Sequence, residues 1–207
     1  MQQWLVPSPE PGIAAHALLF RPSGEGSFPR ALIAHASTQN VLRRAQMPQP
    51  ECRAMAAWLV MRGFAVLVPE RLGHGATGGK YLEDQGGCDE ADYSRAGRAT
   101  AASIESALSY LRGQSFVRQD GAVIVGHSAG GWGALALARE NPQGVARIIA
   151  FAPDAFRTGG DKVDLHVLPA SGSEGHWLAE TEAGVKIAGS VLERALMLLH
   201  PTVVKKR

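Results

Sequence analysis

The residues with the clearest capacity for chemistry lie in the stretch VIVGHSAGGWGALALA, residues 123–138, where Ser128 is the centre of a Gly-X-Ser-X-Gly pattern. A run of β-branched residues typical of a buried strand precedes the serine, and an alanine-rich, helix-forming run follows it. A serine on a strained strand-to-helix turn points its Oγ away from the sheet, and flanking glycines let neighbouring backbone pass close by. We therefore predict that Ser128 is a nucleophile, with a structural Gly-Ser turn as the alternative.

Two backbone N–H groups are predicted to stabilise the negative oxygen that forms when a serine attacks a carbonyl. The first belongs to Ala129, at the start of the following helix, where free donors and the helix dipole favour negative charge. The second is expected in the loop after the strand RALIAHAS, residues 30–37. Ser37 is the predicted donor there, with Ala36 as the alternative.

A serine hydroxyl is a poor nucleophile until a base takes its proton, so a histidine is expected to accompany Ser128. His176 lies in VLPASGSEGHW, in a glycine-containing loop just beyond a predicted strand, and is the predicted general base. His74 lies in RLGHGATGG, after an earlier strand, and is expected to organise that loop instead.

A carboxylate is expected to orient the imidazole by accepting its Nδ1–H. Asp154 directly follows the predicted strand 145–153 and is the preferred candidate, with Asp161 and Asp164 as alternatives. A helix N-cap is the structural interpretation of Asp154.

Two further side chains are candidate substrate contacts. Trp132 lies just after the serine motif and His35 lies in the loop that is predicted to supply the second N–H donor. Packing in the core is the alternative for Trp132. The polar, glycine-containing stretch 79–93 is a candidate rim for the site.

Strand-like and helix-like segments alternate along the chain, which predicts an α/β fold with a mostly parallel, doubly wound sheet and helices on both faces. Ligands of such sheets bind at the carboxyl ends of the strands, where the candidate residues are expected to converge. All residues, 1–207, are assigned to a single domain. The predicted strands are 14–22 (with 3–6 as a candidate pairing partner), 30–37, 64–70, 121–126, 145–153 and 163–170, and the predicted helices are 50–63, 92–113, 129–140 and 180–199.

Composition narrows the classes of function. The net charge of +2 does not suggest a nucleic-acid partner. No stretch of 18 apolar residues predicts a membrane span, and the first residues do not resemble a signal peptide, so a cytoplasmic location is expected. Cys52 and Cys88 form neither a disulfide framework nor a metal-ligand pattern, and whether they pair is left open. No metal is expected, and the oligomeric state is not predicted.

The motifs resemble the dienelactone-hydrolase-like proteins of the α/β-hydrolase superfamily. The matching pieces are ALIAHAST, RGFAVLVPERLGHGATGG, GHSAGG and LPASGSEGH, which occur in the order typical of that family. The resemblance implies a serine hydrolase that acts on a small-molecule ester or related acyl compound without a cofactor. It also implies that Ser128 is the nucleophile and His176 the base. Ala36 departs from the pattern, because the family usually has glycine there.

A second departure concerns residues 154–162, which join two predicted parallel strands. Such a crossover usually needs about a dozen residues or more, so a strand-helix unit near the C-terminal edge is inferred to be absent. A displaced or unpaired final strand is the alternative to a well-formed sheet. The main hypothesis is a serine esterase; the alternatives are a catalytically impaired binding protein with the same fold and a peptidase-like serine hydrolase.

Overall fold

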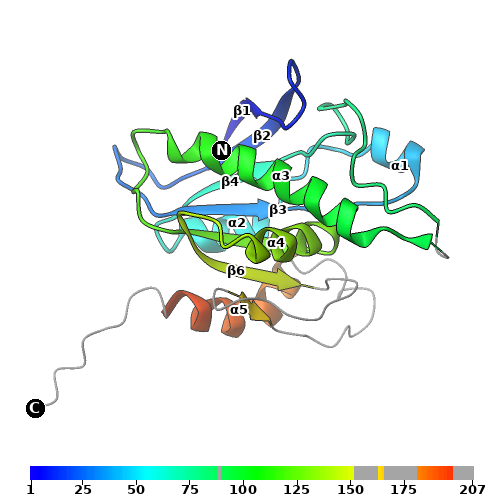
Figure 1. The fold of residues 1–207 in the computed structure, drawn as a ribbon. Helices are drawn as coiled ribbons and strands as arrows, with labels where there is room; N and C mark the ends of the chain where they lie inside the picture. Colours follow the sequence, from blue (N-terminus) through cyan, green and yellow to red (C-terminus); the bar gives the residue numbers. More distant parts are fainter. Residues whose placement is uncertain (88–89, 152–162, 166–180, 198–207) are drawn as a thin grey trace, which may run out of the picture.

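The computed structural model describes residues 1–87, 90–151, 163–165 and 181–197 (Figure 1). In this part of the chain, seven strands form one sheet in the order β1-β2-β4-β3-β5-β6-β7. The strands are β1 (Gln2–Pro7), β2 (Ala14–Phe20), β3 (Arg30–Ala34), β4 (Ala65–Pro69), β5 (Ala122–His127), β6 (Val145–Phe151) and β7 (Val163–Leu165).

The central strands of the sheet are parallel. β3 pairs with β4 on one side, where Leu32 is opposite Leu67, and with β5 on the other, where Leu32 is opposite Ile124. β2 is antiparallel to both β1 and β4. Because the chain moves from β3 outward to β4 and then back across to β5, the strand order reverses beside β3. Ligands of open α/β sheets bind in the crevice that such a reversal leaves at the carboxyl edge.

Helices cover both faces of the sheet (Figure 1). α3 (Tyr93–Arg112) and α4 (Ala129–Arg139) pack on one face, over a core that includes Ile104, Leu111 and Leu137. α2 (Arg53–Val60) and α5 (Glu182–Met197) pack on the other face, over a core that includes Met55 and Leu192. α1 (Val41–Ala45) is a short helix in the segment between β3 and β4.

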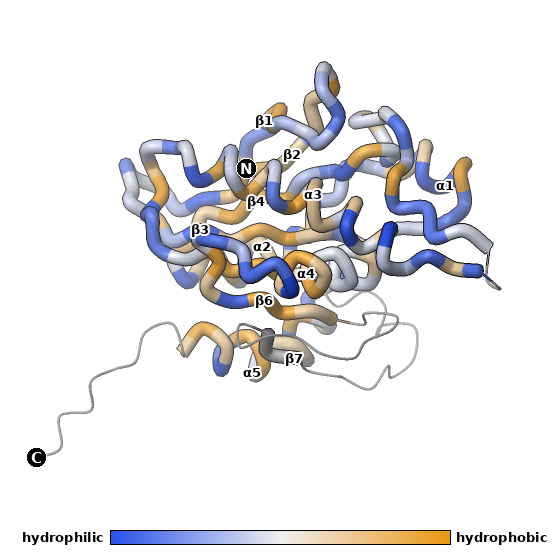
Figure 2. Tube along the Cα trace, viewed as in Figure 1, coloured by the Kyte–Doolittle hydropathy of each residue, from blue (hydrophilic) through white to orange (hydrophobic). Residues whose placement is uncertain are grey.

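Burial on both faces explains why the central strands are almost uninterrupted apolar runs. Every residue of β3, β4 and β5 is buried, whereas the edge strand β1 is mostly exposed. Figure 2 shows hydrophobic stretches, in orange, along the central strands of the sheet. Each fully buried Leu or Ile side chain contributes about 1.5–3 kcal/mol to the free energy of folding. The apolar sheet is therefore a rigid base for the loops at its carboxyl edge.

The observed architecture confirms the predicted α/β class, with a mostly parallel sheet covered on both faces. The alternative of a displaced final strand is wrong, because β7 pairs in parallel with β6 and Asp164 is opposite Ile149. Residues 166–170 of the predicted final strand lie outside the described residues. The short helix α1 was not predicted, since five residues leave no clear helical periodicity.

Candidate active site

Ser128 lies on a sharp turn between β5 and α4. Its φ of 51° and ψ of −121° lie in a backbone region that non-glycine residues rarely adopt, at a cost of about 1–3 kcal/mol. Hydrogen bonds hold the turn: the Ser128 N–H donates to Phe151 O at 2.9 Å, and the Trp132 N–H donates to Ser128 O at 2.9 Å. The Ser128 side chain makes no capping hydrogen bond to its own helix. The Ser128 hydroxyl on this strained turn is therefore not occupied in capping the N-terminus of α4.

The glycines around Ser128 allow the close approach that was predicted. A Cβ on Gly126 would lie 2.6 Å from the Cα of Gly131, and a Cβ on Gly130 would lie 2.6 Å from the carbonyl oxygen of His35 and overlap that of Ala34. Any side chain at these positions would push α4 away from β5 and β3. The glycines therefore seat the N-terminus of α4 against the loop that follows β3.

The two predicted N–H donors come from these adjoining segments. Ala129 is the first residue of α4, and Ser37 lies in the loop after β3 that Gly130 approaches. Within the described part of the chain, neither the Ala129 N–H nor the Ser37 N–H donates a hydrogen bond to the protein. Ala129 directly follows Ser128, and Ser37 follows β3, the strand that pairs with β5.

His35 lies inside the protein, only 2% exposed, and both ring nitrogens have protein partners. The Arg71 N–H donates to His35 Nε2 at 3.1 Å, so Nδ1 carries the proton and donates to Ala36 O at 2.6 Å. Burial, followed by the nearby Arg71 charge, holds the pKa of His35 well below 6.5. His35 is therefore neutral, and this geometry differs from the predicted direct contact with substrate.

The neutral His35 has a direct effect on the loop beside it. Its Nδ1–H holds the Ala36 carbonyl, and a trans peptide unit is planar with its C=O and N–H pointing in opposite directions. Fixing the Ala36 carbonyl therefore also fixes the Ser37 N–H on the other side of the same peptide. The His35 ring therefore sets the direction of the Ser37 N–H, the predicted donor to the oxyanion.

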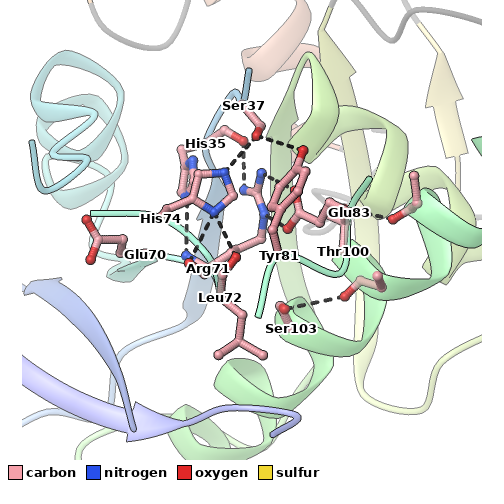
Figure 3. A network of polar contacts seen from close by, with 12 residues as sticks. His35, Ser37, Glu70, Arg71, Leu72, His74, Tyr81, Glu83, Thr100 and Ser103 are labelled. Carbon is pink, nitrogen blue, oxygen red and sulfur yellow. Dashed lines mark hydrogen bonds and ion pairs between the residues drawn. The ribbon is translucent and has the colours of Figure 1, made fainter. Parts of the chain in front are cut away.

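His74 anchors the same loop through the Ser37 side chain (Figure 3). Its Nε2 lies 2.7 Å from Ser37 Oγ, while its Nδ1 lies 3.0 Å from Leu72 O and 3.2 Å from Arg71 O. Burial first, and the Arg71 charge second, lower the pKa of His74 to about 4. The ring is neutral at pH 7, so Nδ1–H donates to the carbonyls and Ser37 donates to Nε2. These contacts agree with the prediction that His74 organises its loop.

Arg71 joins these groups into one network (Figure 3). Its Nε and one terminal nitrogen donate to the two carboxylate oxygens of Glu83 at 2.6 and 3.1 Å, and the other terminal nitrogen donates to His35 O at 2.7 Å. The ion pair is buried, since the two side chains are 0% and 5% exposed. Sequence reasoning missed Glu83, which lies in a loop with no periodic pattern and has a partner twelve positions away.

A small cavity lies beside Ala129. It is lined by α3 and α4 residues that include Ala96, Thr100 and Trp132, and by the segment after β4 that includes Tyr81 and Glu83. Trp132 is held in place by its ring N–H, which donates to Tyr93 O at 2.6 Å. The predicted rim 79–93 thus contributes to the cavity, and Trp132 forms part of its wall.

His176 and Asp154 lie outside the described residues, as does Asp161. Cys88 does too, and Cys52, which directly precedes α2, is buried in the core. Among the described residues, no cluster of three or more His, Cys, Asp or Glu side chains is suited to a metal ion. In the same part of the chain, no helix combines the length and the apolar character that crossing a membrane requires.

Comparison with known families and structures gives one family and one fold. The model of the family described as "Putative esterase" matches residues 81–183, slightly less than half of the chain. The α/β hydrolase GrgF from Penicillium sp. sh18 is 21% identical with a TM-score of 0.56, over 73% of this chain and 45% of that one. Est1E from Butyrivibrio proteoclasticus, solved with ferulic acid, is 23% identical with a TM-score of 0.51, over 72% of this chain and 52% of that one.

The esterase Pf2001 from Pyrococcus furiosus is 16% identical with a TM-score of 0.52, over 73% of this chain and 51% of that one. The chain thus spans about half the length of the solved structures it matches. No curated protein matches the sequence. The chain has the α/β-hydrolase fold, and its match to the family model described as "Putative esterase" lies in the part that begins after β4.

Proposed function

We propose that this protein is a serine hydrolase that cleaves a small-molecule carboxylic ester, or a related acyl bond, through an acyl-enzyme on Ser128. In this proposal His176 is the general base, Asp154 orients its imidazole, and the Ala129 and Ser37 N–H groups stabilise the oxyanion. The ester oxygen leaves with the proton that His176 took from Ser128. Water then attacks the acyl-enzyme with His176 again as base, which releases the acid and restores the serine.

The conformation of Ser128 is the observation that carries the proposal. Its positive φ is maintained by tight packing of Gly126 and Gly130, and its hydroxyl is not used to cap α4. Strain that the surrounding structure over-determines is typical of active sites. The N-terminus of α4 beside the serine favours the negative charge that develops during acyl transfer.

Ser37 is the competing serine, because its Oγ lies 2.7 Å from a histidine nitrogen. Three features favour Ser128 instead. Ser37 follows β3 on an irregular loop, so no helix N-terminus begins at the residue after it. Its partner His74 has a pKa of about 4 and is a weak base. The Nδ1–H of His74 faces the carbonyls of Arg71 and Leu72, which stabilise an imidazolium less than a carboxylate does.

Covalent labelling with a fluorophosphonate probe tests the proposal and separates the two serines. We expect one probe per chain, located by peptide mapping on Ser128. Labelling and the hydrolysis of p-nitrophenyl acetate should both disappear in Ser128→Ala. In the matched variant Ser37→Ala the backbone N–H remains, so labelling should persist and the rate of hydrolysis should fall by no more than about tenfold, since one hydrogen bond contributes about 1 kcal/mol.

Two results would contradict the proposal. Labelling on Ser37 alone would move the nucleophile to the β3 loop. A chain that stays folded by circular dichroism but neither reacts with the probe nor hydrolyses the ester would be a binding protein on a hydrolase fold. A peptide-amide panel that is cleaved faster than esters would favour the peptidase-like alternative.

A further inference from the structure

We infer that the cavity beside Ala129 holds the acyl part of the substrate and restricts it to short, uncharged acyl groups. This inference rests on the proposed function, since it assigns a substrate class to the same site. It depends on the position, size and charge of the cavity.

The position of the cavity indicates which half of an ester occupies it. Ala129 lines the cavity, so a group inside it is attached close to a carbonyl bound by the Ala129 N–H. The other lining residues come from α3, from α4 and from the segments after β3 and β4, and these two strands lie on one side of β5. His176, the proposed base, follows β7 in the sequence, and β7 lies at the edge of the sheet on the opposite side of β5. The leaving alcohol needs a proton from the base, so it is assigned to the β6–β7 side and the acyl group to the cavity.

The size of the cavity limits the acyl group. Its volume is about 40 Å³, which is above the roughly 10–15 Å³ that a single water molecule needs. Ligand pockets for larger molecules are typically about 300–1,000 Å³. The cavity is therefore far smaller than such pockets, so the acyl group inside it must be short and a long chain must displace a wall.

The walls of the cavity are held firmly. The Trp132 ring N–H is bonded to Tyr93 O at 2.6 Å, and a Cβ on Gly97 of α3 would lie 2.5 Å from that same ring nitrogen. Thr100 is buried against Gly133 of α4. Movement of this wall would break the packing of α3 on α4, so it resists longer acyl chains.

The charge of the cavity excludes an anionic acyl group. Glu83 is the acidic residue among its described lining residues, and none of these is a lysine, arginine or histidine. Arg71 lies behind Glu83, and its Nε and both terminal nitrogens already donate to Glu83 and His35 O. A carboxylate on the substrate would lose its hydration without gaining a cation.

A series of p-nitrophenyl esters tests the inference. We expect kcat/KM to be similar for the acetate and butyrate, and at least about tenfold lower for the octanoate, since misfit in a rigid pocket costs 1–3 kcal/mol. The monosuccinate has the four-carbon chain of the butyrate but ends in a carboxylate, and should also be at least about tenfold slower than the butyrate. An octanoate or monosuccinate that is hydrolysed as fast as the butyrate would overturn the corresponding part of the inference.

Substitutions in the wall of the cavity test whether the selectivity for acyl length arises there. Ala96→Leu fills the cavity from α3 and should lower kcat/KM for the butyrate more than for the acetate. Ala102→Leu makes the same change at an exposed site on the same helix and should leave the ratio unaltered. Trp132→Phe gives a second variant, which should raise the octanoate-to-acetate ratio. If both wall variants keep the ratios of the unmodified protein, the acyl group binds elsewhere and the inference is wrong.

The failure of the proposed function would look different. A protein that hydrolyses no ester in the series and is not labelled at Ser128 overturns both the function and the inference. A protein that is labelled at Ser128 and hydrolyses all the esters equally retains the function and loses only the assignment of the cavity.

Discussion

Two regions meet at Ser128 and are held by different forces. On one side, β5 and α4 are packed backbone against backbone, with Gly126 and Gly130 leaving no room for a side chain. On the other side, the loop after β3 is held by the side chains of His35, Arg71 and His74, which are all buried. The first region depends on shape and the second on charge and protonation. They are therefore expected to fail under different perturbations.

The largest expected effect is on the side held by charge. Glu83→Gln keeps the shape of the side chain but leaves the Arg71 guanidinium buried without a carboxylate, which typically costs about 3–5 kcal/mol. Urea denaturation should show this loss in the free energy of unfolding. Glu193→Gln is the matched control, because its pair with Arg62 is largely exposed and should change that free energy by less than about 1 kcal/mol. Equal effects in the two variants would mean that the Arg71–Glu83 pair does not hold the loop.

Gly130→Ala breaks the side held by shape. The new Cβ meets the backbone carbonyls of Ala34 and His35, which cannot rotate away as a side chain can. We expect a loss of about 1–3 kcal/mol in the free energy of unfolding, together with lost activity. Gly189→Ala in α5 has open space around its Cβ and should raise helix stability by up to about 1 kcal/mol. A Gly130→Ala protein as stable and active as the control would show that close packing of α4 is unnecessary.

Acid should weaken the charged side and leave the packed side unchanged. The pKa of His74 is lowered by burial to about 4, so the unfolded chain takes up a proton near pH 6.5 while the folded protein does not. Stability from this group is therefore complete above pH 6.5 and is lost as the pH falls toward 4. The loss in the free energy of unfolding should reach about 1.4 kcal/mol per pH unit within this window.

Comparison with His74→Gln isolates that contribution from the carboxylates. The difference in unfolding free energy between the two proteins should narrow steadily from pH 6.5 to pH 4 as the histidine in the unfolded chain becomes protonated. A difference that stays constant across this range would mean that His74 does not titrate on unfolding, contrary to its burial between Ser37 and the Arg71 turn.

The packed side of the site is the region that the sequence predicts well. The pattern around Ser128 predicts the strand, the turn and the helix, because each glycine and each apolar residue there has a local physical reason. The buried runs likewise predict the parallel strands and both helical layers. β7 pairs in parallel with β6 although few residues connect the two strands. The alternative of a displaced final strand is therefore wrong.

The side held by charge is much harder to predict from the sequence. The His35 ring supports the Ala36 carbonyl from a buried position, and burial is a property of the folded loop rather than of the residue. The ion pair between Glu83 and Arg71 depends on the folded conformation of the segment after β4, which has no periodic pattern in the sequence. The cavity beside Ala129 needs α3, α4 and that segment together, so no single motif predicts it.

Trapping the acyl-enzyme tests the central claim most directly. The full chain is mixed with p-nitrophenyl acetate, quenched in acid within the first turnovers and analysed by peptide mass spectrometry. We expect one acetyl group on the peptide that contains Ser128, and no such acetylation or hydrolysis in Ser128→Ala. Undiminished hydrolysis in Ser128→Ala, or acetylation confined to another residue, would contradict the account.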